Sequence, residues 1–341
     1  MQKKNKISGD ELAVGGQAVL EGVMMRAKDK YVVSVRSPSG EIKELIKKVD
    51  PKKGMNKTLR NIPFVRGIFV LFDSMKIGFK ALDFSSDVLI DEDESSDDTK
   101  LKQKENAEKQ KTKSSSKKTD LKKTHNKKEG KEHKSNSETK GMGIFVIITF
   151  ILSMVFAIFL FKFIPYWTSG LISNSGSRVW IEGIIKASIF IGYLLLISLN
   201  KDVKRVFMYH GAEHKSIHCY EKYGLNGLTV KRALKQSRIH KRCGTTFLFL
   251  TIFISIVVYA FIPFNYGFWI SFGLRILFLP LIAGISFEIL KLVPKLSNKN
   301  PIKWILFVIE YPGLLMQNIT TKEPNAEQLE VAINSLKRVL E

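Results

Sequence analysis

The sequence predicts a mainly α-helical membrane protein. We expect about four transmembrane helices, an interfacial amphipathic helix, a re-entrant or interfacial C-terminal segment and a small N-terminal β unit. The chain is 45% hydrophobic yet carries a formal charge of +22, which is typical of apolar spans separated by basic solvated segments. Four apolar stretches each approach the ~20 residues that cross ~30 Å of hydrocarbon. An alternating pattern near the N-terminus indicates strands.

Residues 1–58 are expected to form a cytosolic β-rich unit. Residues 31–36 and 41–46 alternate between apolar and polar side chains, and residues 37–40 between them have the composition of a turn, so a hairpin is predicted. The segment before this hairpin has glycines around Glu21, but it lacks the spacing of a P-loop or a dinucleotide fingerprint. The N-terminus has no apolar core of the kind that a cleavable signal peptide needs.

Residues 59–90 are expected to contain an amphipathic interfacial helix, over about 61–84. Its charged residues fall on one narrow stripe at 100° per residue, and the rest of its surface is apolar. Such a helix suits the bilayer interface or a position beside the spans. The residues of the stripe are Arg66, Asp73, Lys76, Lys80 and Asp83.

Residues 91–140 form a low-complexity linker that is expected to be disordered. From Lys100 to Lys140 it has 15 lysines against 6 acids and almost nothing apolar to bury. It is either a solvated linker or a lysine arm that contacts anionic lipid headgroups or ribosomal RNA. The expected partners are therefore anionic membrane lipid and, through this linker, a ribosome or translocon, whereas DNA is not expected.

Residues 141–300 are expected to hold the spans, at about 143–164, 179–199, 245–264 and 267–290. The loop 200–244 carries 11 Lys and Arg residues and the segment 291–303 carries four, whereas 165–178 has only Arg178. The positive-inside rule therefore places the linker, the loop 200–244 and both termini in the cytoplasm of a cell whose membrane the chain crosses several times.

Residues 301–341 are expected to close the chain with two further elements. The segment 304–317 is too short to span and contains Glu310 and Pro312, so a re-entrant or interfacial helix broken near the proline is predicted. Residues 324–340 place Leu329, Ile333 and Leu336 on one side and predict a cytosolic amphipathic helix.

Three histidines in the loop 200–244 share one helical face. His210, His214 and His218 follow one another at a spacing of four, with Glu213 beside them. Two imidazoles one turn apart can hold one transition-metal ion. Residues 210–214 also fit the His-x-x-Glu-His pattern of inverted zincins, in which the Glu is the general base. Nitrogen, oxygen and sulfur ligands together suit zinc best among divalent ions.

A second set of candidate ligands comes from later in the chain. His240 and Cys243 lie just before the third expected span, and Glu288 lies at the cytosolic end of the fourth. Cys243 and Cys219 are both expected to be reduced in the cytosol. Lys215 or Arg242 would hold an anionic substrate group. The alternative is a purely structural role, in which the histidines bond to the backbone or to lipid phosphate.

Other ionisable residues stand in apolar surroundings. Arg275 lies within the fourth expected span and needs a partner, for which Glu182 of the second span is the natural choice; Lys186 can share that carboxylate. We expect a structural ion pair. Glu310 is a possible ligand, substrate contact or helix cap, and the role of Glu21 is equally open.

These segments resemble the YqhQ family, bacterial membrane proteins grouped by a domain of unknown function. The resemblance rests on residues 15–26, 209–221, 240–246, 310–313 and 320–333, and it covers the chain from about residue 12 to 341 apart from the linker. It implies a predicted metal-dependent membrane enzyme and no particular substrate. Here residues 240–243 read His-Lys-Arg-Cys where the family has His-Pro-Arg-Cys, which keeps both possible ligands.

The leading hypothesis is a membrane protein with a metal site at its cytosolic face that hydrolyses a membrane-proximal substrate. In it Glu213 would deprotonate the attacking water. The rival is a non-catalytic scaffold or accessory factor of a ribosome, translocon or membrane-insertion complex. A transporter is weaker, because no chain of polar residues crosses the spans. The sequence does not show whether the N-terminal β unit covers the histidines.

Overall fold

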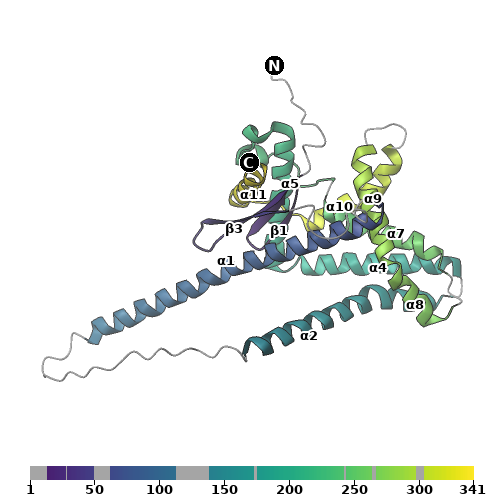
Figure 1. The fold of residues 1–341 in the computed structure, drawn as a ribbon, viewed down its shortest axis with the longest axis horizontal. Coiled ribbons are helices and arrows are strands. Elements are labelled where there is room, and N and C mark those ends of the chain that lie inside the picture. Colours follow the sequence, from purple (N-terminus) through teal and green to yellow (C-terminus); the bar gives the residue numbers. More distant parts are fainter. Residues whose placement is uncertain are drawn as a thin grey trace, which may run out of the picture. The chain divides into compact units, whose positions relative to one another are not determined.

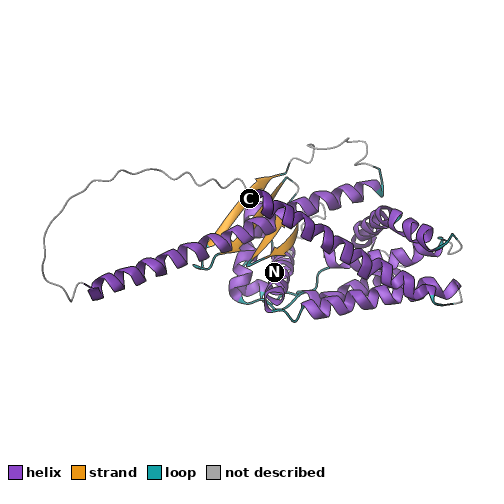
Figure 2. Cartoon of the chain, turned by 90° about the horizontal axis from the view of Figure 1, so that it is seen from below, coloured by secondary structure: helices purple, strands orange, loops and turns teal. Residues whose placement is uncertain are grey.

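The computed structural model describes residues 14–27, 29–49, 62–112, 138–172, 175–241, 243–262, 266–296 and 303–341. The chain divides into two compact units. One unit contains Met1–Glu92 and Pro165–Glu341, and the other contains Asp93–Ile164. The first unit holds the sheet and the histidine-bearing helix, and its elements are shown in Figures 1 and 2.

A four-stranded antiparallel sheet forms the N-terminal part, in the order β1 (Gly15–Val19), β2 (Gly22–Arg26), β3 (Lys30–Arg36) and β4 (Ile42–Lys48). The predicted hairpin is confirmed, with Val33 of β3 opposite Leu45 of β4. Residues 15–26 form a second hairpin that sequence analysis did not predict. Its two-residue connection includes Glu21, whose φ of 48° is the left-handed conformation that such tight turns require.

Both faces of this sheet are covered by helices. Val23, Met25 and Val32 pack against α5 (Lys201–Tyr223) and α11 (Ala326–Leu340). Val33 and Val35 on the opposite face pack against α1 (Val65–Thr112). The expected C-terminal amphipathic helix is α11, and it begins with a capping box between Asn325 and Gln328. The result is a helix–sheet–helix arrangement, which explains why β2 and β3 are apolar at successive positions.

Helix α1 is longer than expected. Its first part lies on the sheet, and several apolar side chains there are exposed, among them Phe72, Met75 and Phe79. We expected the helix to end by residue 90 and a disordered linker to follow, but the helix continues to Thr112. The continuation is rich in Lys, Glu and Asp and has neither Gly nor Pro, so it lacks the two residues that most strongly end a helix. Residues 113–137 of the linker lie outside the described residues.

Within the part of the chain that the structure describes, three helical segments are long and apolar enough to cross a membrane, rather than the four expected. They are Ile148–Gly170, Gly176–Ile197 and Phe268–Leu292. The first comprises most of α2 (Glu138–Ile158), a π-helical turn (Phe159–Phe163) and α3 (Ile164–Gly170). The second is most of α4 (Ser175–Ile197), and the third joins α8 (Phe268–Leu277) to α9 (Leu279–Leu296).

The remaining expected span is α7 (Gly244–Ala260), an apolar helix of 17 residues. At 1.5 Å per residue it is about 26 Å long, somewhat short of the hydrocarbon thickness. It begins directly after Cys243, whose sulfur accepts a hydrogen bond from the N–H of Thr245. The helix begins one residue before the expected span of 245–264 and ends at Ala260, so it is shorter than predicted at its C-terminal end.

Helix α10 (Lys303–Thr320) runs without a break through Pro312, so the predicted break at the proline is wrong. A proline inside a helix removes one backbone hydrogen bond and costs ~3 kcal/mol. Close packing against α7 offsets that cost. At Gly313 an added Cβ would lie 2.6 Å from Cγ2 of Thr246, so the two helices approach as closely as a glycine allows.

Candidate metal centre

The histidines are placed by helix α5, whose two ends are well defined by the sequence. The side-chain oxygen of Asn200 accepts hydrogen bonds from the N–H groups of Asp202 and Val203, at 2.8 and 3.2 Å. The helix ends at Gly224, whose φ is 70°. Between these ends the four-residue spacing puts His210, His214 and His218 on one face, as the sequence predicted.

The first group of side chains that could hold a metal ion consists of His210, His214 and Cys243. Their ligand atoms lie within 4.8 Å of one another. The Nδ1 of His210 donates to the carbonyl of Thr320 at 2.8 Å, and the Nδ1 of His214 donates to the carbonyl of Arg238 at 2.6 Å. A carbonyl only accepts, so each proton is on Nδ1 and each Nε2 keeps its lone pair.

The imidazoles of His210 and His214 both lie near the sulfur of Cys243. The Nε2 of His210 lies 3.2 Å from Sγ of Cys243, and a ring nitrogen of His214 lies within 4.8 Å of the same sulfur. Nitrogen and sulfur ligands of a tetrahedral zinc ion lie about 3.5 Å apart, given Zn–N and Zn–S bonds of ~2.0 and ~2.3 Å. The metal-free spacing is close to this value. Histidines whose second ring nitrogen is bound by a carbonyl are the usual form of zinc ligands.

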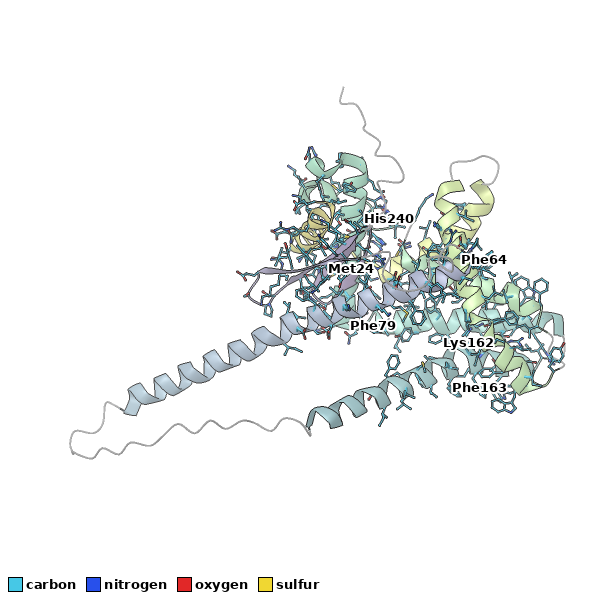
Figure 3. All side chains as sticks on the ribbon, viewed as in Figure 1. Met24, Phe64, Phe79, Lys162, Phe163 and His240 are labelled. Atoms are coloured by element: carbon cyan, nitrogen blue, oxygen red, sulfur yellow. The ribbon has the colours of Figure 1, made fainter. Side chains whose placement is uncertain are left out.

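A second group lies next to the first. It consists of His218, Glu221 and His240, whose ligand atoms are again within 4.8 Å of one another. His240, labelled in Figure 3, comes from the loop between α6 (Val230–Ala233) and α7. The ring centroids of His214 and His240 are 5.6 Å apart, so the two groups are contiguous.

Glu213 lies between the two groups and under the sheet. It is buried, and the N–H of Gly16 in β1 donates to it. Burial raises the pKa of Glu213, and the nearby His210 and His240 oppose that rise. A Cβ at Gly16 would lie 2.9 Å from Cδ of Glu213. The N-terminal β unit therefore covers the histidine cluster, which the sequence had left open.

Burial also affects the imidazoles. It lowers the pKa of His214 and of His240, while the Glu213 carboxylate acts in the opposite direction on His240. A histidine is charged when the pH is below its pKa. Because the pKa of His214 and that of His240 are lowered, both rings are neutral at pH 7. A neutral imidazole is the form that ligates a metal ion.

The loop 237–243 is held against α5 by the C-terminal end of α10. The side-chain amide of Gln317 donates to the carbonyl of His240 at 2.9 Å and accepts from the N–H of His240 at 2.8 Å. The guanidinium of Arg238 donates to the carbonyl and the hydroxyl of Thr321, at 2.9 Å each. These contacts orient the carbonyls that bind His214 and His218.

Several predicted site residues are not brought to this cluster. Glu288 instead pairs with Arg66 of α1 and accepts the N–H of Phe64. Its prediction as a ligand relied on its depth in the fourth span, and depth does not fix the direction of a side chain. Lys215, predicted to bind substrate, is buried; it donates to the carbonyl of Leu234 and forms an ion pair with Glu323. Arg242, the other predicted substrate-binding residue, lies outside the described residues.

Glu21 and Glu310 each have a basic partner. Glu21 binds Arg205 through both oxygens and accepts the hydroxyl of Tyr209 at 3.2 Å, so it joins the sheet to α5. Glu310 lies 3.6 Å from the ammonium of Lys241, and its Oε1 is buried without a hydrogen-bond partner among the described residues.

The predicted ion pair between apolar helices is present. Arg275 lies 3.2 Å from Glu182, and Lys186 lies 3.5 Å from the other oxygen of that carboxylate. All three side chains are buried. Tyr166 and Tyr259 place their rings against the Arg275 guanidinium, with centroids at 4.6 and 5.4 Å. The cluster belongs to the helix packing and lies apart from the histidine groups in sequence and in its contacts.

Three residues of the centre were not predicted from the sequence. Glu221 stands three residues after His218, a spacing that places it on the same face, so its signal was present in the sequence. Gly16 and Gln317 lie far away along the chain, and only the fold brings them to the histidines. No local pattern could have identified either of them.

The comparisons with known proteins cover nearly the whole chain. The model of a family described as "Protein of unknown function (DUF1385)" matches residues 62–341. The chain is 34% identical over 334 residues to "Uncharacterized protein YqhQ" of Bacillus subtilis (strain 168), an alignment that covers 96% of this chain and 92% of that protein. No solved structure matches the chain. The chain therefore belongs to the DUF1385 family, whose function is unknown.

Proposed function

We propose that this protein is a membrane-bound, metal-dependent hydrolase that acts on a membrane-proximal substrate at the cytosolic surface. One observation carries the proposal. The Nδ1 atoms of His210 and His214 are both bound by backbone carbonyls, and both rings are directed at the sulfur of Cys243. This arrangement supports a bound transition-metal ion. Two imidazoles and a thiolate suit zinc better than harder divalent ions.

The roles of the residues follow from their positions. His210, His214 and Cys243 would hold the ion. When bound, such an ion polarises a carbonyl or phosphoryl oxygen and lowers the pKa of water. Glu213 would accept the proton of the attacking water, because its buried carboxylate lies beside the cluster and burial raises its pKa toward neutrality. Gly16 fixes the position of that carboxylate through its N–H and its lack of a side chain.

The membrane location is supported by the elements on either side of the cluster. Helix α4 ends at Ile197, four residues before α5 begins, and α7 begins one residue after Cys243. Two apolar helices therefore lead directly into the candidate site, which places it at a membrane surface if these helices cross. The 11 Lys and Arg residues of the loop 200–244 support a cytosolic location of that surface.

The test begins with the metal content of the full chain, purified in detergent without a chelator or a polyhistidine tag. We expect close to stoichiometric zinc in the parent protein and a loss of zinc in His214→Ala. His125→Ala is the matched control, because His125 lies in the linker, far from the cluster in sequence. Folded parent protein that binds no zinc even when zinc is supplied would overturn the proposal.

The hydrolase itself is tested with Glu213→Gln. We expect the zinc-loaded parent, in micelles containing anionic lipid, to hydrolyse chromogenic esters or phosphodiesters. The Glu213→Gln protein should keep its zinc and lose at least 100-fold in rate, since a positioned base contributes about 10²–10⁴-fold. An unchanged rate in that variant would remove Glu213 as the base, and a zinc-loaded parent that hydrolyses none of these probes would contradict the hydrolase.

A further inference from the structure

We propose that the chain binds a second divalent cation at His218, Glu221 and His240, so that the centre holds two ions. This inference rests on the proposed function, because it extends the same site. It makes the candidate centre a pair of adjacent three-ligand groups on one helical face and one loop. It also predicts a particular class of substrate, one with an anionic group.

The protonation of the second group is set by the same loop as that of the first. The Nε2 of His218 donates to the carbonyl of Ile239 at 2.9 Å, so its lone pair is on Nδ1. This carbonyl directly follows that of Arg238, which binds His214. The carbonyls of two consecutive loop residues, Arg238 and Ile239, thus orient one imidazole in each group. A carbonyl that binds the second ring nitrogen is the usual partner of a metal-ligating histidine.

The spacing of the ligand atoms fits an ion. The Nδ1 of His218 lies 3.8 Å from Oε2 of Glu221, and the Nε2 of His240 lies 3.5 Å from Oε1. Both distances exceed those of a well-formed hydrogen bond, ~2.7–3.2 Å. Nitrogen and oxygen ligands bound at ~2.1 Å in a tetrahedron are about 3.4 Å apart. The spacing of the second group is therefore close to that of a ligand set.

Glu213 connects the two groups. It acts electrostatically on His210 of the first group and on His240 of the second, and it is buried beneath β1. A buried carboxylate is destabilised unless cations lie nearby. In two-metal hydrolases the ions are about 3.5–4 Å apart and clamp both the attacking and the leaving oxygen. Two such ions on either side of Glu213 would stabilise its buried carboxylate.

The charges indicate the substrate class. The Cys243 thiolate and the carboxylates of Glu213 and Glu221 carry three negative charges. Two divalent ions carry four positive charges, so the loaded centre is left with one positive charge in a mostly buried site. It would attract an anionic group such as a phosphodiester or a carboxylate. The ions would bind the anionic group of the substrate without help from Lys215. The ammonium of Lys215 already contacts the carbonyl of Leu234 and the carboxylate of Glu323.

The two groups differ in their chemistry, and that difference gives a direct readout. The first group has a cysteine sulfur, whereas the second has only nitrogen and oxygen donors. Cobalt(II) bound to a thiolate shows a charge-transfer band in the near ultraviolet. Chelator-treated full chain in detergent is therefore titrated with cobalt(II). We expect the band to be complete after one equivalent, while visible d–d absorption rises to two equivalents.

The variants assign each ion to its group. After zinc loading and desalting, we expect two zinc ions per parent chain, one in Glu221→Gln and one in Cys243→Ser. Glu330→Gln is the matched control, because Glu330 is exposed and bonds only Arg36 in the hydrogen-bond and ion-pair contacts of the described residues. It should retain two ions.

The failure of this inference is distinct from that of the proposed function. Saturation of the parent at one zinc and one cobalt, with Glu221→Gln unchanged, would overturn the second site and leave the first intact. No binding at all would overturn both. The cobalt titration of the parent needs no substitution, so the inference remains testable even if Glu221→Gln fails to fold.

Discussion

The side-chain amide of Gln317 makes two hydrogen bonds to the main chain of His240, one to its N–H and one to its carbonyl. Gln317 is fully buried, and its amide nitrogen also lies 3.3 Å from the hydroxyl of Thr246 at the start of α7. One residue of α10 thus ties the loop that carries His240 to the helix that follows Cys243. Gln317 thus fixes the positions of His240 and Cys243 relative to each other, although it is not itself one of the candidate ligands.

Gln317→Ala should therefore weaken the centre without removing a ligand. Two buried backbone groups would lose their partners, which is expected to cost about 2–4 kcal/mol in the free energy of unfolding. Zinc affinity should fall by about 10–100-fold, as is usual when a group that orients metal ligands is lost. Thermal unfolding in detergent and competitive zinc titration measure the two effects.

Asn318→Ala is the control for that substitution. Asn318 is the next residue, but it is exposed, and its side chain accepts a 3.3 Å contact from Arg238 and no other hydrogen bond from the described residues. Its loss should change stability by no more than about 0.5 kcal/mol. If Gln317→Ala kept the zinc affinity of the parent, the loop would be positioned by other contacts.

Two neighbouring glycines allow a matched test of how β1 covers Glu213. A Cβ at Gly16 would lie 2.7 Å from the carbonyl oxygen of Met24 and 2.9 Å from the Glu213 carboxylate, whereas a Cβ at Gly15 meets nothing within 4 Å. Gly16→Ala should displace either β1 or Glu213, with a loss of about 1–3 kcal/mol in stability and a fall in metal-dependent hydrolysis. Gly15→Ala should match the parent in both measurements. Equal behaviour of the two variants would mean that β1 does not constrain Glu213.

The sequence predicted those parts of the fold that depend on local pattern. The strands β3 and β4 alternate clearly, and the spacing of His210, His214 and His218 requires a helix to bring them together. The pair of Arg275 and Glu182 was predictable because a charge in an apolar helix needs a partner. In each case the signal lies within one element or follows from a strong energetic demand.

Features that depend on packing between distant segments were not predictable. Pro312 suggested a break in α10, but contact with α7 at Gly313 keeps the helix continuous. Glu288 had the right depth for a ligand, yet Arg66 takes its carboxylate. Gly16 reaches Glu213 only because β1 lies on α5. Local pattern gives no measure of such contacts, since each one couples residues far apart in the chain.

The two cysteines should differ in their reactivity. Cys219 is fully buried, and burial raises the pKa of its thiol, so at pH 8 it stays in the protonated, unreactive form. It should resist iodoacetamide until the protein unfolds. Cys243, a candidate zinc ligand, should be protected in the zinc-loaded protein and become reactive when a chelator removes the metal. Mass spectrometry of digested protein measures both sites, and Cys243 reactivity that is independent of zinc would argue against its role as a ligand.

The buried cluster of Glu182, Lys186 and Arg275 should be much more sensitive to loss of the acid than to loss of the lysine. Glu182→Gln removes the carboxylate that both cations share, and breaking a buried ion pair in this way costs about 3–5 kcal/mol. Lys186→Met keeps the pair of Glu182 and Arg275 and has a similar volume, so it should cost less than about 1.5 kcal/mol. Thermal unfolding in detergent, followed by tryptophan fluorescence, compares the two variants. If they lose equal stability, the lysine contributes as much as the carboxylate, and the ion pair is not what holds these apolar helices together.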